Sequence, residues 1–216
     1  MSIASTNINT KFFDSLLNGN RITCSQLIKE QVKQGIDIKD LYENVMKPSL
    51  YKIGELWELN KISVATEHLA SAIVEAILNE LYPHLVTACK KESKAIVLCV
   101  ENEHHQIGVK MVSDILETNG WHSYFLGANT PIKELIDFAK TTNPDLIAIS
   151  MSLFFHLPLL EKMIQKISEE MPNTQILVGG QGFRRGGIDV IAKYSNVLYL
   201  PNLFEFDQYL KTLPYE

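Results

Sequence analysis

The stretch from Val100 to Gly108, which reads Val-Glu-Asn-Glu-His-His-Gln-Ile-Gly, decides how the rest of this sequence is interpreted. An apolar run, residues 95–100, precedes it, and apolar residues at helical spacing, residues 109–116, follow it. A strand that leads through a polar loop into a helix begins a β-α-β unit. Ligands of open α/β sheets bind at the carboxyl ends of the strands. The two histidines and two carboxylates of this loop are therefore the first place to look for chemistry.

Residues 89–216 alternate between strand and helix patterns. The predicted strands are 94–100, 122–126, 145–150, 175–179 and 197–200, and the predicted helices are 106–119, 131–142, 158–171, 186–194 and 203–211. Turn pairs such as Asn143-Pro144 separate them. Asn129 and Thr130 are expected to cap the helix that follows them. Five parallel strands alternating with helices predict a doubly wound, flavodoxin-like (Rossmann-like) α/β domain.

Residues 1–88 have the pattern of amphipathic helices joined by short polar turns, which predicts a four-helix bundle that forms a cap module. Thr23 or Ser25 is expected to cap the second helix, and Ser63 the last one. Pro48 either kinks the third helix or begins a new segment.

The composition restricts the class of protein. The chain of 216 residues contains 46% hydrophobic and 21% charged residues, which is usual for a folded protein. Its net charge of −5 argues against direct binding of nucleic acid. The three cysteines, Cys24, Cys89 and Cys99, lack metal-ligand spacing and are interpreted as reduced thiols. Neither a signal peptide nor a membrane span is visible, so we expect a soluble, cytoplasmic protein.

The residues alone leave two interpretations of His105. It is either a solvated loop histidine or a metal ligand whose second ring nitrogen is hydrogen-bonded to Glu103, which would fix the ring and raise its basicity. Gly108, just inside the following helix, would let a bulky flat ligand approach the backbone closely. The loop contains neither a glycine-rich dinucleotide motif nor a phosphate-binding loop.

The stretch resembles the cobalamin-binding motif Asp-x-His-x-x-Gly, with Glu103 in place of the aspartate. The resemblance implies that His105 is the lower axial ligand of cobalt. It also implies that the nucleotide tail of the cofactor lies at the ends of two later strands, which read Ser-Met-Ser and Gly-Gly here. The residues so assigned are Ser150, Ser152, Gly179 and Gly180, with Ser152 in place of the leucine of the family. From the residues alone, the glycine pair is equally a plain strand-to-helix turn.

A second motif lies in the helical half, where Trp57 is followed after nine residues by Glu67 and His68. Periodicity alone makes Trp57 a core tryptophan and His68 a boundary histidine. The spacing nevertheless resembles the Trp-x9-Glu-His signature of CarH-type photoreceptors, which bind adenosylcobalamin. This resemblance implies that Trp57 packs beside the adenosyl group and that Glu67 contacts it. It also implies that His68 takes the upper axial position once the adenosyl group is lost.

Together the two resemblances imply a cobalamin-binding sensor without catalytic residues, with adenosylcobalamin as the expected cofactor and light as the expected signal. Because the first ten residues are too few to form a MerR-type DNA-binding domain, we expect none before the cap module. The signal is therefore expected to leave through a homo-oligomer or through a separate signalling protein.

Three alternatives remain open. The protein could be a corrinoid methyl carrier of a methyltransferase system, loaded with methylcobalamin, which is the enzymatic alternative. It could bind heme or another tetrapyrrole with the help of His104, His122 or His156, although these histidines are otherwise expected at the surface or at a boundary. It could also be a protein–protein interaction module with an empty cleft.

Overall fold

A computed structural model describes residues 3–85 and 92–213 of the chain, with side chains described from residue 8 onward. The chain divides into two compact units, Met1–Leu85 and Val86–Glu216, which are considered separately. Cys89 lies outside the described residues. No helix within the described residues is both long and apolar enough to cross a membrane.

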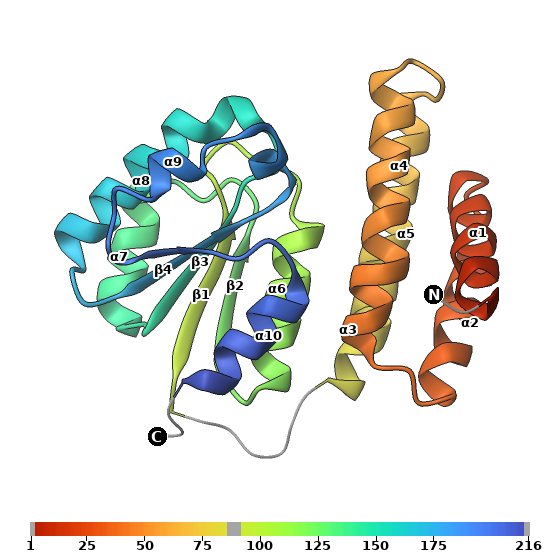
Figure 1. Ribbon diagram of the computed structural model, residues 1–216, viewed down its shortest axis with the longest axis horizontal. Helices are drawn as coiled ribbons and strands as arrows, with labels where there is room; N and C mark the ends of the chain where they lie inside the picture. Colours follow the sequence, from red (N-terminus) through yellow and green to blue (C-terminus); the bar gives the residue numbers. More distant parts are fainter. Residues whose placement is uncertain (1–2, 86–91, 214–216) are drawn as a thin grey trace. The chain divides into compact units, whose positions relative to one another are not determined.

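The first unit is helical, as predicted (Figure 1). Its elements are α1 (Ile3–Leu17), α2 (Arg21–Lys33), α3 (Ile38–Leu41), a π-helical turn (Tyr42–Met46), α4 (Lys47–Glu58), α5 (Val64–Leu81) and a 3-10 turn (Tyr82–His84). Large apolar side chains from all of the longer helices are buried in its core; they include Phe12, Leu16, Ile28, Tyr42, Met46, Ile53, Ile77 and Leu78. Helices α4 and α5 run antiparallel and side by side.

The helix caps follow from short polar side chains. Ser63 caps α5 as predicted, because its side chain accepts a hydrogen bond from the backbone N–H of Thr66. The prediction for α2 was wrong. Asn20, not Thr23 or Ser25, is the cap, and its side chain accepts from the backbone N–H of Thr23 at 3.1 Å. The helix therefore begins at Arg21, one turn earlier than a Thr or Ser cap requires.

Pro48 lies inside a continuous helical run rather than between two separate helices. It occupies the first turn of α4, where its missing N–H costs least. The π-helical turn directly precedes it, and the N–H of Lys47 donates to the carbonyl of Tyr42. Since Pro48 cannot donate to the carbonyl of Asn44, a wider turn at this point accommodates the interrupted α-helical pattern.

The second unit contains a five-stranded parallel sheet with helices between the strands (Figure 1). Its elements are β1 (Lys94–Cys99), α6 (Ile107–Thr118), β2 (His122–Gly127), α7 (Ile132–Thr142), β3 (Leu146–Ser150), α8 (Leu157–Glu170), β4 (Gln175–Gly179), α9 (Ile188–Ile191), β5 (Val197–Tyr199) and α10 (Leu203–Thr212), with 3-10 turns at Phe154–His156 and Gln181–Arg185. The strand order is β2-β1-β3-β4-β5, which confirms the flavodoxin-like prediction.

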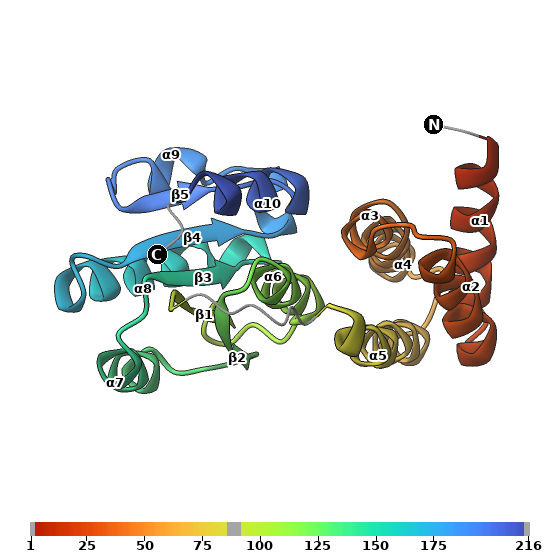
Figure 2. The same cartoon turned by 90° about the horizontal axis from the view of Figure 1, so that it is seen from below.

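Two helical layers cover the sheet, with α6 and α10 on one face and α7, α8 and α9 on the other (Figures 1 and 2). On the latter face, alternate residues of the central strands pack against α7 and α8; they include Ile96, Leu98, Ile147, Ile149, Ile176 and Val178. Because β1, β3 and β4 are covered on both faces, they read as nearly continuous apolar runs. Strand β1 lies between β2 and β3, so its carboxyl end has neighbouring loops on both sides.

Two local predictions in this unit were wrong. The helix expected over 186–194 is only the short α9, because Gly186 and Gly187 have φ values of 122° and 95°, which interrupt a right-handed helix. Asn129 and Thr130 do not cap α7, whose N-cap residue is Pro131 with no side-chain cap. The role of Asn129 is instead in the loop that follows β1.

Candidate functional site

The loop between β1 and α6 is fixed by backbone hydrogen bonds and by the neighbouring loop. Val100 donates to the carbonyl of Ser150 at the end of β3, at 3.0 Å. The side chain of Asn129 accepts from the backbone N–H of Asn102, and the backbone N–H of Asn129 donates to the carbonyl of Glu103. Gln106 accepts from the N–H of Ala128. The loop is thus tied to the ends of both strands beside β1.

Glu103 is the centre of this loop, and its side chain is fully buried. Its Oε1 accepts from the backbone N–H groups of His104 and His105 and from Nδ1 of His105. Its Oε2 accepts from the backbone N–H groups of Ser152 and Leu153, at 3.3 and 3.0 Å. A buried carboxylate is tolerated only when donors replace the lost water, as they do here.

The electrostatics keep this carboxylate ionised. Burial raises the pKa of Glu103, but the hydrogen bond and charge of His105, together with backbone donors of His105 and Leu153, outweigh burial and lower the pKa from 4.5 to about 2. In the neutral form of His105, an ionised Glu103 favours the tautomer with the proton on Nδ1, and in this tautomer the lone pair lies on Nε2. The predicted hydrogen bond between Glu103 and the second ring nitrogen of His105 is therefore confirmed. The His105 side chain is 48% exposed.

His156 is also part of this cluster, contrary to the expectation of a surface or boundary residue. It is only 8% exposed, and its Nδ1 lies 3.2 Å from Oε2 of Glu103. One signal in the sequence could have predicted this contact. His156 follows Ser150, the end of β3, and the loops after adjacent parallel strands meet at the same edge of the sheet.

Gly108 does not have a backbone conformation that requires glycine, and its missing side chain leaves open space. It is the second residue of α6, and a Cβ placed on it would meet no other atom within 4 Å. Within the described residues, no neighbouring atom therefore requires glycine at this position.

The residues predicted for the tail pocket lie at the carboxyl ends of β3 and β4, as expected for their place in the sequence. Ser150 is buried at the end of β3, and Ser152 uses its backbone N–H to bind Glu103. Gly180 has φ 108°, and a Cβ there would lie 2.4 Å from the carbonyl oxygen of Met151. Gly179 accepts from the N–H of Met151 at 2.9 Å. The close approach of the loops after β3 and β4 is therefore sufficient to explain why Gly180 is a glycine.

Trp57 lies in the last turn of α4, and Glu67 and His68 lie in the first two turns of α5, with residues 59–63 as the connection between the two helices. Trp57 is 42% exposed, so the interpretation as a core tryptophan is wrong. Glu67 accepts from the hydroxyl of Ser71, and its Oε2 lies 3.7 Å from Nε2 of His68. The side chain of His68 is 74% exposed.

The predicted residues therefore form two groups, one in each unit. Within the described residues, no three His, Cys, Asp or Glu side chains come together as a metal-binding group. Of the two histidines on Glu103, His105 has the more exposed side chain, and one exposed imidazole beside a carboxylate suits a metal whose remaining positions are filled by a macrocycle. His104 and His122 are exposed and belong to neither group.

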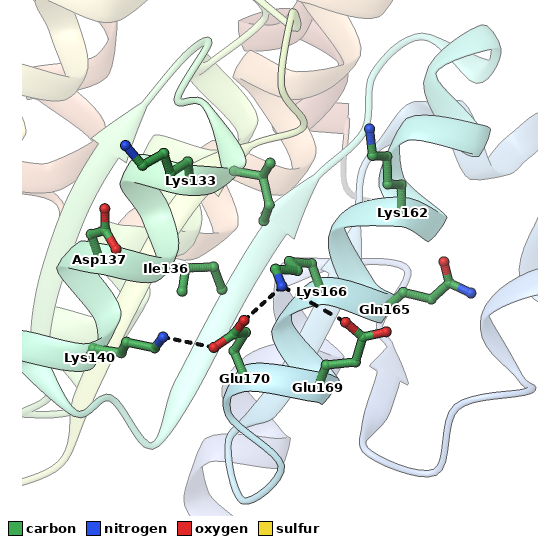
Figure 3. Close-up of a pocket in the computed structure, with 10 residues that line it drawn as sticks. Lys133, Ile136, Asp137, Lys140, Lys162, Gln165, Lys166, Glu169 and Glu170 are labelled. Carbon is green, nitrogen blue, oxygen red and sulfur yellow. Dashed lines mark hydrogen bonds and ion pairs between the residues drawn. The ribbon is translucent and has the colours of Figure 1, made fainter.

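A groove of about 430 Å³ lies elsewhere, between α7 and α8 (Figure 3). Its lining includes four lysines and three acidic residues, namely Lys133, Lys140, Lys162, Lys166, Asp137, Glu169 and Glu170. Glu170 lies between Lys140 and Lys166, with both ammonium groups at 2.7 Å. None of the predicted site residues lines this groove.

Comparison with known families gives two matches. The profile of a family described as "B12 binding domain" matches residues 93–194, and a second family with the same description matches residues 8–82. The two matches fall in the two different units of the chain.

Individual relatives agree with these matches. Dimethylamine corrinoid protein 1 of Methanosarcina acetivorans is 29% identical over 174 residues, which cover 76% of this chain and 81% of that protein. The HTH-type transcriptional repressor CarA of Myxococcus xanthus is 25% identical over 176 residues, which cover 81% of this chain but only 58% of that protein.

Among solved structures, the monomethylamine corrinoid protein of Methanosarcina barkeri has a TM-score of 0.81 at 19% sequence identity, over 96% of this chain and 99% of that one. At this identity the likeness shows the fold. The family matches cover the loop between β1 and α6 and the helices that contain Trp57 and His68, and so residues 8–82 and 93–194 of this chain are B12-binding domains of these two families.

Proposed function

We propose that this protein binds cobalamin with His105 as the lower axial ligand of cobalt and acts as a light-responsive sensor of the adenosyl form. The observation that carries the proposal is the pair of Glu103 and His105 at the carboxyl end of β1. The carboxylate is buried and ionised, and the imidazole is half exposed. Such a carboxylate orients a ligating histidine and raises its basicity.

The other residues of this unit would contact the corrin and its tail. Gly108 would lie beside the ring, where its lack of a Cβ leaves space. The ends of β3 and β4 would line the pocket of the nucleotide tail through Ser150, Ser152, Gly179 and Gly180. Bound adenosylcobalamin supplies a cobalt–carbon bond that light cleaves, and this chemistry belongs to the cofactor.

The helical unit would supply contacts to the upper face of the cofactor. Trp57 presents a large exposed apolar surface, which fits packing against an adenosyl group. Glu67 would accept a hydrogen bond from this group. His68, exposed and next to Glu67, would bind cobalt once the adenosyl group is lost. The altered contacts of Trp57 and His68 would shift the population of two packing states, and self-association or a partner protein would detect this shift.

A corrinoid methyl carrier is the second candidate. It is favoured by the similarity to proteins named as corrinoid proteins, including the 29% identical relative from Methanosarcina acetivorans. In that case His105 would have the same place below cobalt, and the exposed surface around Trp57 would give access to a methyltransferase.

Visible spectra test the main proposal. The protein is mixed in the dark with adenosyl-, methyl- or hydroxocobalamin, and spectra are recorded before and after green light, with free cofactor as the control. We expect His105→Ala to abolish tight binding. We expect His68→Ala to leave the dark spectrum unchanged and to alter the spectrum of the illuminated protein. Identical spectra of illuminated wild type and His68→Ala would reject the sensor mechanism, and methyl transfer to an added methyltransferase would favour the carrier.

Gly108→Ala tests the place of the ring without disturbing the fold. In the free protein an added methyl group at this helical position meets nothing, so we expect stability to be unchanged or slightly higher. Overpacking against a bound ring costs about 1–3 kcal/mol, which weakens cobalamin binding roughly 5- to 150-fold. Gly54→Ala, at a helical glycine with equally open surroundings, is the control for stability. Unchanged affinity of Gly108→Ala would place the ring elsewhere.

A further inference from the structure

Asn102 forms a turn that leads the chain from β1 to Glu103. It has a left-handed backbone conformation with φ 67°, and the N–H of Glu103 donates to the carbonyl of Val100 at 2.9 Å across this turn. A β-turn with a positive φ at its third residue favours glycine or asparagine, because most other side chains clash with the backbone there. Since Asn102 directly precedes Glu103, this turn determines the direction in which the Glu103 side chain leaves the backbone.

Asn129, in the loop after β2, holds this turn across 27 residues of sequence. Its Oδ1 accepts from the backbone N–H of Asn102 at 3.2 Å, and its backbone N–H donates to the carbonyl of Glu103 at 3.0 Å. The two bonds therefore enclose the backbone of residues 102 and 103. Asn129 is itself left-handed, with φ 52°, and its side chain does not cap α7.

The direction of the Glu103 side chain matters because its carboxylate meets partners on two sides. Its Oε2 accepts from the N–H groups of Ser152 and Leu153, at 3.3 and 3.0 Å, and its Oε1 accepts from Nδ1 of His105. Glu103 is fully buried, and a buried carboxylate is destabilised when it misses its donors. A shifted turn at Asn102 would therefore separate the carboxylate from the imidazole of His105.

We propose that Asn129 is a positioning residue for axial ligation, which arranges the loop between β1 and α6 before the cofactor binds. Asn129 holds the left-handed turn at Asn102, and this turn directs the carboxylate of Glu103 to Nδ1 of His105. The inference rests on the proposed binding of cobalamin by His105. It makes the loop after β2 a determinant of cobalamin affinity, through its hydrogen bonds to the backbone of residues 102 and 103.

Three variants of the full-length protein separate the side-chain acceptor from the backbone conformation. Asn129→Gly removes the acceptor, but glycine still adopts a positive φ without strain. Asn129→Asp retains an acceptor oxygen at the same place. Asn143→Gly is the matched control, because Asn143 is also left-handed, with φ 49°, and lies at the other end of α7. Circular dichroism and urea unfolding check that each variant is folded.

The first readout is hydrogen exchange in the protein without cofactor, measured by mass spectrometry of the peptide that contains residues 100–106. The backbone N–H groups of Glu103, His104 and His105 are all hydrogen-bonded and report on this loop. Loss of one hydrogen bond should make their exchange roughly 3- to 10-fold faster in Asn129→Gly. We expect Asn129→Asp and Asn143→Gly to exchange as the wild type does.

The second readout is cobalamin binding. Spectral titration gives the dissociation constant for hydroxocobalamin, and the nitrogen superhyperfine splitting in the EPR spectrum of bound cob(II)alamin reports a nitrogen ligand on cobalt. We expect Asn129→Gly to weaken binding roughly 3- to 10-fold and to reduce the fraction of split signal, because the loop has to be ordered on binding. Asn129→Asp and Asn143→Gly should resemble the wild type.

A second substitution tests whether Asn129 acts through the turn. Glycine at position 102 adopts the left-handed conformation without steric cost, so the turn no longer depends on support from Asn129. Asn102→Gly should therefore restore most of the affinity that Asn129→Gly loses. Double-mutant analysis of the four dissociation constants measures this coupling.

The outcomes separate the inference from the proposed function. The inference would be overturned by an Asn129→Gly variant with wild-type exchange and affinity, by an equal loss in Asn129→Asp, or by a failure of Asn102→Gly to restore binding. A wild type without cobalamin binding, or with splitting that survives in His105→Ala, would instead refute the proposed function.

Discussion

At the scale of single residues, hydrogen-bond donors make the buried charge of Glu103, in the loop between β1 and α6, tolerable. Glu103 is fully buried, yet donors from two loops lower its pKa to about 2. Burial acts in the same direction on the nearby thiol of Cys99, but there hydrogen-bond donors do not offset it. Burial, and secondarily the charge of Glu103, raises the pKa of Cys99 to about 12. Burial likewise raises the pKa of Cys24 to about 11.

These thiols should be unreactive in the folded protein. The thiolate is the reactive species, and both cysteines are fully buried. We expect Cys24 and Cys99 to resist N-ethylmaleimide at pH 8 and to react at once in urea, as measured by mass spectrometry of peptides. The pKa of each thiol is higher in the folded protein than in the unfolded chain, so the thiols of the unfolded chain ionise at lower pH. The free energy of unfolding should therefore fall as pH rises above about 9.

A Cys89→Ser background restricts this experiment to the two buried thiols. Rapid modification of either one in the native protein would show that the surrounding core opens readily.

At the scale of elements, the start of α5 matters both for the stability of the helix and for the proposed site. Ser63 caps this helix, and Glu67 and His68 follow within its first two turns. The cap residue thus fixes where the helix begins and where these side chains emerge.

Ser63→Ala should destabilise the helical unit by about 1 kcal/mol, because the N–H of Thr66 loses its acceptor. Urea unfolding monitored by circular dichroism measures this difference. Ser63→Asp provides the matched control, since aspartate also accepts from the helix N-terminus and should retain stability. Equal loss in both variants would show that the hydroxyl has another function.

The pair α7 and α8 is joined at the surface by an ion-pair cluster on Glu170 (Figure 3). Hydrogen bonds from Lys140 and Lys166, and then their charges, lower the pKa of Glu170 to about 2. A carboxyl group with a lowered pKa stabilises the fold above its ordinary pKa. This contribution should therefore be complete above about pH 4.5 and lost as pH falls toward 2.

NMR titration of the Glu170 carboxyl carbon measures this pKa directly. Lys140→Ala should move it back toward 4.5, and so should high salt, because exposed charges are screened. Lys133→Ala, at a lysine of the same groove that does not contact Glu170 in Figure 3, is the control. A Glu170 that titrates near 4.5 in the wild type at low salt would contradict the ion-pair geometry.

At the scale of the whole molecule, each unit has its own core, and each matches its own B12-binding family. A ligand that binds only the folded state stabilises every unit that it contacts. Calorimetry of the loaded protein can therefore report which units contact the cofactor.

We expect cobalamin at a concentration of 100 times its dissociation constant to stabilise the protein by about 2.7 kcal/mol. If the helical unit also contacts the cofactor, Trp57→Ala should lower this stabilisation, and His105→Ala should remove it. Stabilisation that is identical in wild type and Trp57→Ala would leave only the α/β unit in contact with the cofactor. The unfolding of each variant without cofactor provides the baseline.

The sequence determined the local features of this protein. Ser63 as a helix cap, the five strands and the hydrogen bond between Glu103 and His105 follow from residues close together in the chain. For the cap and the hydrogen bond, the interacting groups are separated by one turn or less, and the strands are recognised by their short apolar runs. The flavodoxin-like strand order also followed, since alternating strands and helices leave few topologies.

Only the tertiary structure decided the contacts between distant segments. His156 meets Glu103, and Asn129 meets Asn102, because β3 and β2 pair with β1 in a register that brings their loops to one edge. Trp57 is exposed rather than buried because helix packing, not its own apolar character, determines which side of α4 faces the core. Such contacts depend on the register of strands and the rotation of helices, and these are set by the packing of the whole unit rather than by any local pattern.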